Sequence, residues 1–323
     1  MTRRFPIRRR GWWTAAGLLL VAMAGTIVLT AAASYQQAAE RQRTQLADVA
    51  NEIHTAIAQD LQRANDALDL VRSEVPSFVG GHLPQGAWGA RLAAIVRQTP
   101  GVRTMLVLDA DGKVISSNRP ELMGNVFKGS ERFQTISQSP DPRMLHMSAP
   151  FVTPLGNFTV SLGKVLQGEQ GRFAGYVLAI VDPKHLTSAL ERAVFADDVN
   201  VSLVHIDGRV VIRVPDNEDV VGMDLSKSPA AMIWTFVRGG QSQDVVLGAT
   251  ATTGRESFVA FRRIAPTVAP VEKQLVLTVA RDAAAVFAPW RASLIWKGVL
   301  FVLVGVAVCA WLWRMEHAPP PAT

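Results

Sequence analysis

The sequence predicts an α+β fold in which two tandem copies of one small module lie outside a membrane, between two transmembrane helices. The first observation is a hairpin that occurs twice, over residues 105–117 and 201–214. Each copy has an apolar strand, an Asp-Gly turn and a second β-branched run. Asp-Gly between such runs is a strong hairpin signal, because glycine readily takes the positive φ that the turn requires. The second observation is that two long apolar segments bracket this repeat.

The two copies continue alike after the hairpin. Each passes a later glycine, a short apolar helix candidate and two or three more strands, and ends in an acidic residue. The glycines are Gly124 and Gly222, the helix candidates are 133–136 and 232–237, and the acids are Asp182 and Asp282. The spacing of the two acids nearly equals that of Asp111 and Asp207 in the two turns. We therefore expect each module to be an antiparallel sheet with flanking helices.

The apolar segments predict a two-pass membrane protein. Residues 11–33 carry no charge, and 23 helical residues are enough to cross a hydrocarbon layer of about 30 Å. Residues 293–313 form the second span, whose one charge, Lys297, lies near its end. Five arginines within residues 1–10 place the N-terminus in the cytoplasm by the positive-inside rule. Residues 34–292 are then outside a bacterial inner membrane, in the periplasm or outside the cell, and 314–323 form a short cytoplasmic tail.

A cleaved signal peptide is the main alternative to the first span. The run Ala31-Ala32-Ala33 resembles a cleavage site of small residues, but the apolar stretch before it is longer than the core of a typical signal peptide. We therefore favour an uncleaved helix.

Charge and cysteine content exclude several classes of function. The net charge is +6, and five of these units come from the first ten residues, so the basic character reflects membrane topology. The exported segment has no basic run with interleaved aromatics, which argues against a nucleic-acid partner. The single cysteine, Cys309, lies in the second span and excludes a disulfide within the chain or a cysteine-based metal site.

Residues 34–75 predict one long helix that leaves the membrane. Its apolar positions follow two heptad-like seams joined by a four-residue stutter, and Pro76 together with the glycine-rich cluster 80–84 ends it, because proline lacks the NH that a helix needs. The seam covers the core of the chain's own module, or part of it pairs with a second chain in a homodimer, and both can hold at different heights of the same helix. The seam residues are Leu46, Val49, Ile53, Ile57, Leu61, Ala64, Leu68, Val71 and Val75.

Residues 127–182, and above all the run 171–183, resemble the double Cache (tandem PAS-like) sensor region of bacterial diguanylate cyclases and histidine kinases. Residues 258–264 and 288–291 are similar to the last strands of the same family and its return to the membrane. The resemblance implies a membrane-distal module that binds a small molecule, over 76–190, and a smaller membrane-proximal module over 191–292. It also implies dimers that pass the signal through the second span, without enzymatic chemistry and without a cofactor.

Two departures from the family bear on the ligand. Ser130 stands where relatives commonly carry an Arg, and Phe158 and then Lys164-Val165 replace a Trp and a pair of Arg. Since a carboxylate is best held by bidentate Arg, these losses put an amino-acid or dicarboxylate ligand in doubt, although Arg132 and Lys164 could partly substitute. The candidate ligand-binding residues that the resemblance implies are Arg132, Phe133, Met147, Phe158, Lys164, Tyr176 and Asp182. Alternatively, the apolar ones are ordinary core, the charged ones lie on the surface, and Asp182 caps the next helix.

Signatures of enzymes are absent from the sequence. It has no nucleophile elbow, Walker loop or dinucleotide-binding glycine run, and its exported histidines show no metal-ligand spacing. The ten residues after Trp313 are too few for the cyclase or kinase domain that relatives carry, so we expect a separate cyclase, kinase or chemotaxis-type output protein. The alternatives are a non-signalling envelope binding or assembly module, and a truncated cyclase or kinase sensor.

The two-span topology predicts the outcome of reporter fusions. A reporter at Gln85 should be active outside the cytoplasm and one after Thr323 inside it, because the arginine-rich N-terminus fixes the orientation. Activity of both fusions on one side, or a mature chain that begins near Ser34, would contradict this topology.

Overall fold

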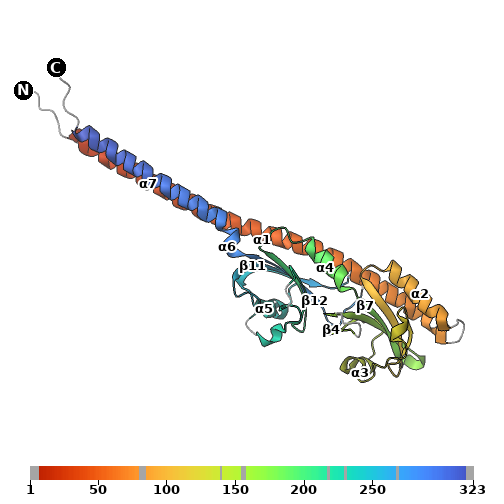
Figure 1. Ribbon diagram of the computed structural model, residues 1–323. Coiled ribbons are helices and arrows are strands. Elements are labelled where there is room, and N and C mark those ends of the chain that lie inside the picture. Colours follow the sequence, from red (N-terminus) through yellow and green to blue (C-terminus); the bar gives the residue numbers. More distant parts are fainter. Residues whose placement is uncertain are drawn as a thin grey trace, which may run out of the picture. The chain divides into compact units, whose positions relative to one another are not determined.

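The computed structural model describes residues 7–79, 85–138, 140–153, 158–216, 219–228, 231–266 and 269–317, which fall into two compact units. The first unit comprises residues 1–44 and 283–323. It holds the first part of helix α1 (Ile7–Val79), the short α6 (Ala283–Val286) and α7 (Ala288–His317), and α1 and α7 run antiparallel to each other (Figure 1). Both helices contain stretches long and apolar enough to cross a membrane.

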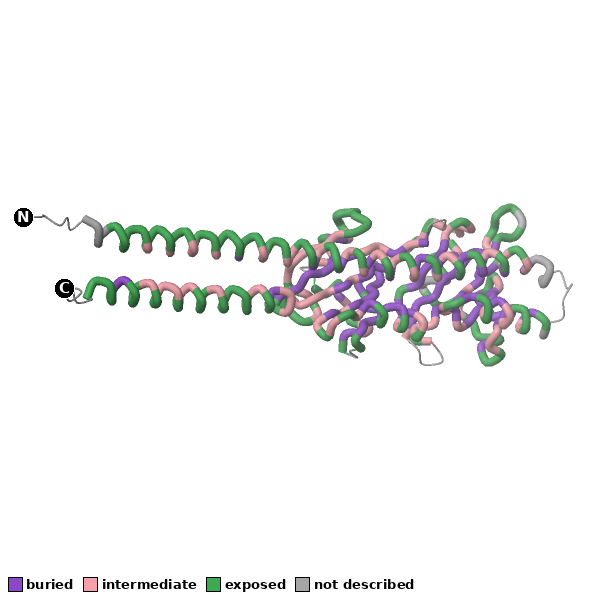
Figure 2. The backbone as a smooth tube through the Cα atoms, turned by 90° about the horizontal axis from the view of Figure 1, so that it is seen from above, coloured by how far each residue is buried: buried purple, intermediate pink, exposed green. Residues whose placement is uncertain are grey.

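Aromatic contacts join the two helices of the first unit. The ring of Tyr35 stacks on that of Phe287, with centroids 4.4 Å apart, and the indole nitrogen of Trp290 donates a hydrogen bond to the carbonyl of Ala31. Elsewhere along the pair, Trp12 and Trp311 meet edge to face. The residues between these contacts are mostly exposed (Figure 2).

The second unit, residues 45–282, contains two five-stranded antiparallel sheets. The first sheet has the order β2-β1-β7-β6-β3 and the second has the order β9-β8-β12-β11-β10, so equivalent strands of the two modules occupy equivalent positions in their sheets. Strands of the first module are β1 (Val102–Asp109), β2 (Val114–Ser117), β3 (His146–Met147), β6 (Ser161–Gln167) and β7 (Phe173–Val181), with the small pair β4 (Phe151–Val152) and β5 (Phe158–Thr159) beside them. Strands of the second module are β8 (Val199–His205), β9 (Val210–Val214), β10 (Gln243–Ala249), β11 (Glu256–Ile264) and β12 (Leu275–Asp282).

The predicted repeat is visible in individual hydrogen bonds. The turn glycines Gly112 and Gly208 both have positive φ, and both hairpins slip register near the end of their first strand. The amide of Gly124 donates to the carbonyl of Val114, and the amide of Gly222 donates likewise to Val210. The two modules therefore share local geometry as well as strand order.

Helices cover both faces of the sheets (Figure 1). The part of α1 after Thr44 lies on one face, together with α2 (Gln85–Gln98) and α4 (Pro183–Glu191). The opposite faces carry α3 (Glu131–Gln138) in the first module and α5 (Met232–Gly239) in the second. In each module an aromatic residue of this helix, Phe133 or Trp234, packs on the turn glycine of the hairpin.

The apolar stripe of α1 packs against the chain's own modules. Leu46, Ile57, Leu68 and Val71 are 0% exposed, and Leu61 is 4% exposed. This corrects the alternative in which the same seam pairs with a second chain, because these side chains are already buried within one chain. Cysteines placed at Leu61 or Leu68 are therefore not expected to cross-link two chains, and a dimer would have to use the outward side of the helix.

Burial of the stripe predicts that alanine substitution at two nearby leucines has very different effects on stability. Leu68→Ala should lower the free energy of unfolding by about 2 to 5 kcal/mol, because it leaves a cavity under a fully buried side chain. Leu70→Ala is the matched control, since Leu70 is 43% exposed, and it should change stability by roughly 0.5 kcal/mol or less. Urea unfolding of the detergent-solubilised chain measures both, and equal losses would show that the stripe does not pack as described.

Candidate functional site

A partly open cavity of about 870 Å³ lies between the sheet of the first module and α3. Strands β1 and β7 form its floor, α3 and the segment before it form one wall, and residues 148–153 and 159–161 form another. Most of the lining is apolar or carries hydroxyl groups. The lining side chains include Arg103, Thr104, Leu106, Leu108, Phe133, Ile136, Ser148, Ser161, Tyr176, Leu178 and Ile180. Sites for small molecules are typically about 300 to 1,000 Å³, so this cavity has the size of a ligand site.

Strand register decides which side chains reach the cavity. Leu178 of β7 is paired directly with Leu106 of β1 and with Gly163 of β6. Directly paired residues point to the same face of a sheet, and side chains alternate between faces along each strand. Leu106, Tyr176 and Leu178 therefore face the cavity, whereas Val177 points to the opposite face and is fully buried.

A glycine makes room for the tyrosine in this floor. A Cβ at Gly163 would lie 2.4 Å from the ring and the hydroxyl oxygen of Tyr176, so the ring lies directly over the glycine backbone. The ring of His146, paired with Gly163 across β3 and β6, meets Tyr176 edge to face at 6.0 Å. This close packing fixes Tyr176 at the edge of the cavity.

The second module contributes to the rim of the cavity. Asp207, Glu272 and Lys273 all line it, although they lie far along the chain from the first sheet. Lys273 forms an ion pair with Asp207 at 2.6 Å, and Oε2 of Glu272 lies within hydrogen-bond distance of Nδ1 of His146, at 2.9 Å. Arg103 also lines the cavity, and among the described residues it has no carboxylate within ion-pair distance.

The join between the modules is also a backbone join. The amide of Leu145 donates to the carbonyl of Pro270, and the amide of Glu272 donates to the carbonyl of Leu145. These two bonds make a short parallel bridge immediately before β3 on one side and shortly before β12 on the other. The rim of the cavity is thereby tied to the strand that leads out of the second module.

The structure separates the seven residues that the sequence implicated. Phe133 and Tyr176 line the cavity, and both also belong to the buried core of the first module. Asp182 caps α4 by accepting a hydrogen bond from the amide of Lys184, which is the structural role weighed for it. Phe158 lies on β5 near Gly222 of the second module, outside the cavity lining. The side chain of Arg132 lies outside the described residues.

Lys164 and Met147 point away from the cavity. Lys164 is 3% exposed, and its ammonium group contacts Asp69 of α1 at 3.2 Å and the carbonyl of Arg143 at 3.4 Å. Met147 is fully buried on the same face, paired with Leu162. The expectation that both line the pocket is therefore wrong. Neighbouring residues of a strand point to opposite faces, and each of these two residues is adjacent in sequence to a residue on the cavity face.

Sequence reasoning did not identify most of the lining. Leu106 and Leu178 are ordinary strand residues in the sequence, and only the register shows that they share a face with Tyr176. The rim residues Glu272 and Lys273 come from another module. The sequence contained one usable signal. Each copy of the repeat has a hairpin followed by equivalent later strands, and these strands together indicate the sheet that forms the floor of the cavity.

The position of Lys164 predicts a structural effect without a change in ligand affinity. Lys164→Ala should lower the free energy of unfolding by about 1 to 3 kcal/mol, because it removes a charge-assisted hydrogen bond to Asp69 and buried methylene groups. Lys113→Ala removes an exposed lysine of the same module and is the control. Urea unfolding compares the stability of the two variants. If Lys164→Ala loses ligand affinity while its stability is unchanged, Lys164 contributes to ligand binding and the structural role is contradicted.

No known family profile matches the chain, and no curated protein matches it. Several solved structures share its fold. The extracellular domain of rpHK1S-Z16, a protein classed as a histidine kinase, is 20% identical, with a TM-score of 0.65 over 78% of this chain and 98% of that one. The periplasmic sensory domain of the Campylobacter jejuni chemoreceptor Tlp1 is 12% identical, with a TM-score of 0.59 over 78% and 99% of the two chains.

A third similar structure contains a small molecule. The ligand-binding domain of the Pseudomonas fluorescens chemoreceptor CtaA, in complex with L-isoleucine, is 16% identical, with a TM-score of 0.53 over 79% of this chain and 97% of that one. At these identities the likeness concerns the fold. The chain therefore has the fold of extracytoplasmic sensor domains of histidine kinases and chemoreceptors.

Proposed function

We propose that this protein is a two-pass inner-membrane receptor whose exported domain binds a small molecule in the cavity of the first module. The observation that carries the proposal is a cavity of about 870 Å³, in a fold that the compared kinases and chemoreceptors use for extracytoplasmic sensing. The shared strand order and turn geometry of the two modules support the double Cache interpretation. Domain boundaries at 76–190 and 191–292 remain part of this proposal.

The lining favours a ligand with a largely apolar body. Leu106, Leu178 and Ile180 offer apolar contact across the floor, and Thr104 and Ser161 offer hydroxyl groups beside them. The charges are confined to the rim, where Lys273 is already paired with Asp207. Arg103 is the lining cation best placed to receive an anionic group of the ligand, and a single guanidinium would complement one carboxylate.

The rim offers a route from the cavity to the membrane. A ligand that contacts Glu272 or Lys273 acts on the segment that is hydrogen-bonded to Leu145 and that continues into β12. Strand β12 ends at Asp282 and is followed without a loop by α6 and α7. We propose that a shift of this segment is transmitted to the second span. The span would pass the signal to a separate cyclase, kinase or chemotaxis-type output protein. The receptor would work as a homodimer.

Binding is tested by a thermal-shift screen of the full chain in detergent. A metabolite that occupies the cavity raises the melting temperature, because it binds only the native state. Leu178→Trp should raise the dissociation constant of that metabolite at least tenfold, because Leu178 is half-buried on the cavity floor and the larger indole ring would occupy part of the cavity. Arg103→Gln should weaken the binding of anionic ligands and leave the binding of neutral ligands unchanged.

Met123→Trp is the matched control for this experiment. Met123 belongs to the first module, is 47% exposed and does not line the cavity, so the same substitution there should leave affinity unchanged. A metabolite that binds Leu178→Trp and the unmodified chain equally well would place the ligand site elsewhere. If no metabolite stabilises the unmodified chain, the non-signalling binding or assembly alternative gains support.

A further inference from the structure

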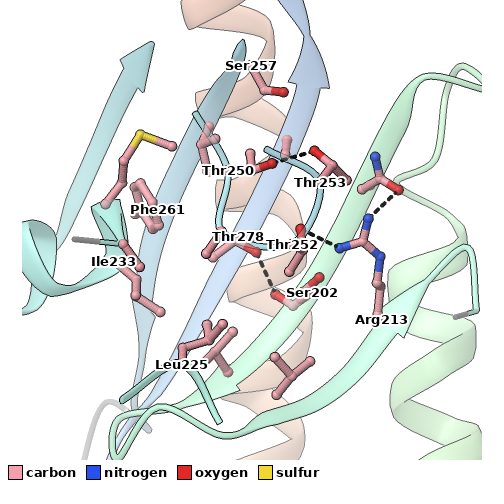
Figure 3. Close-up of a pocket in the computed structure, with 18 residues that line it drawn as sticks. Ser202, Arg213, Leu225, Ile233, Thr250, Thr252, Thr253, Ser257, Phe261 and Thr278 are labelled. Atoms are coloured by element: carbon pink, nitrogen blue, oxygen red, sulfur yellow. Dashed lines mark hydrogen bonds between the residues drawn. The ribbon is translucent and has the colours of Figure 1, made fainter. Parts of the chain in front are cut away.

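The second module contains a smaller cavity, of about 80 Å³, between its sheet, α5 and the loop that joins β10 to β11 (Figure 3). One end is apolar and is formed by Leu225, Ile233 and Phe261. The other end is polar, and Figure 3 shows side chains converging there from several elements. These polar side chains are Asn200, Ser202, Arg213, Thr250, Thr252, Thr253 and Thr278.

The cavity occupies the same place in its module as the larger cavity does in the first. Ser202 of β8 is paired with Arg213 of β9 and with Thr278 of β12, so the three side chains share one face. In the first sheet, the equivalent row contains Leu106 of β1 and Leu178 of β7, both of which line the larger cavity. Both modules therefore have a hollow on the same face. In the second module hydroxyl residues stand in place of the two leucines, and Arg213 stands in the position of Ser117.

Arg213 is a buried cation with neutral partners. The residue is 7% exposed, and its two terminal nitrogens donate to Oγ1 of Thr252 at 3.1 Å and to Oδ1 of Asn200 at 2.9 Å. Its Nε is buried without a hydrogen-bond partner, and no described carboxylate lies within 4.0 Å of the guanidinium. Burial lowers the pKa of Arg213 below its ordinary value, which reflects the cost of this placement.

Buried charges in proteins are normally paired, because an isolated one is costly to desolvate. We propose that the polar end of this cavity binds a small anion, which supplies the missing negative charge to Arg213. The site is independent of the ligand proposed for the first module. It would take a carboxylate of one to three carbons or an inorganic anion such as nitrate or chloride.

The surrounding groups are suited to hydrogen-bond an anion. The hydroxyl of Thr252 accepts from Arg213, so its own hydrogen remains to be donated. The amide nitrogen of Asn200 also donates, since the oxygen of that amide is the atom that accepts from Arg213. Ser202 adds a hydroxyl from the neighbouring strand. On this measure of volume a single water needs about 10 to 15 Å³, so 80 Å³ has room for an anion of a few atoms.

The site also joins parts of the second module that are distant in sequence. Thr252 belongs to the β10–β11 loop, whose Thr250 and Thr253 hydroxyls are 2.6 Å apart, whereas Arg213 lies on β9 at the other edge of the sheet. An anion held by both would fasten this loop over the sheet. Binding should therefore stabilise the second module as well as neutralise Arg213.

Isothermal titration calorimetry of the full chain in detergent tests the proposal, with sodium acetate, sodium nitrate and sodium chloride titrated separately into a buffer based on a bulky anion. We expect saturable binding of at least one of these anions at one site per chain, and the order of affinities distinguishes a carboxylate site from an inorganic-anion site. Arg213→Gln should weaken this binding at least tenfold. If Arg213→Gln does not fold, Thr252→Val provides the second variant, and it should weaken binding several-fold.

Arg255→Gln is the matched control, because Arg255 lies on the same loop, is largely exposed and does not line the cavity. It should change the dissociation constant less than twofold, which separates a local site from a general effect of charge. Two results would overturn the proposal. One is the lack of saturable binding of all three anions to the unmodified chain, and the other is unchanged binding by Arg213→Gln or, in its place, by Thr252→Val.

Discussion

The two-residue alternation of side chains along the central strands is the constraint on which the rest of the structure depends. One face of the first sheet carries Val177, Met105 and Lys164 toward α1 and α2, and these side chains are buried. The other face carries Leu106, Tyr176 and Leu178 toward α3, and it forms the floor of the cavity. A shift of register by one residue would exchange the two faces, so packing of the α1 stripe and formation of the cavity depend on the same pairing.

The same constraint explains why the two modules differ in what they can bind. Their sheets have the same order, their turn glycines have the same conformation, and their helices α3 and α5 cover equivalent faces. Leu106 and Leu178 in the first sheet correspond to Ser202 and Thr278 in the second. One fold therefore presents a large, mainly apolar hollow and a small one with a polar end, and these side chains on one face contribute to the difference.

Much of the fold could be predicted from the sequence because its signals are local. The Asp-Gly turns predicted both hairpins, and the spacing of Leu46 to Val75 predicted the long helix. The expected end at Pro76 was wrong, because the helix continues through this proline to Val79. The placement of Lys164 could not be predicted, since it depends on the register between β6 and β7, which no local pattern specifies. The seam of α1 was ambiguous for a similar reason, because a heptad-like stripe suits either a sheet of the same chain or a second helix.

The candidate site was harder to predict than the fold. Phe133 and Tyr176 were identified because they lie in segments similar to known sensors. Glu272 and Lys273 were missed because they join the rim from the second module. Arg213 sits in a β-branched run, where an arginine usually marks the solvent face of a strand, and only its burial and neutral partners show otherwise.

The central claim is that a ligand in the first cavity acts on the segment that links the two modules. Hydrogen–deuterium exchange of the full chain, with and without a metabolite that raises its melting temperature, tests this most directly. Our account predicts slower exchange at the amides of Leu145 and Glu272 and along β12, as well as in the strands of the cavity floor. Slower exchange confined to the first module, with the amide of Glu272 and strand β12 unchanged, would contradict it.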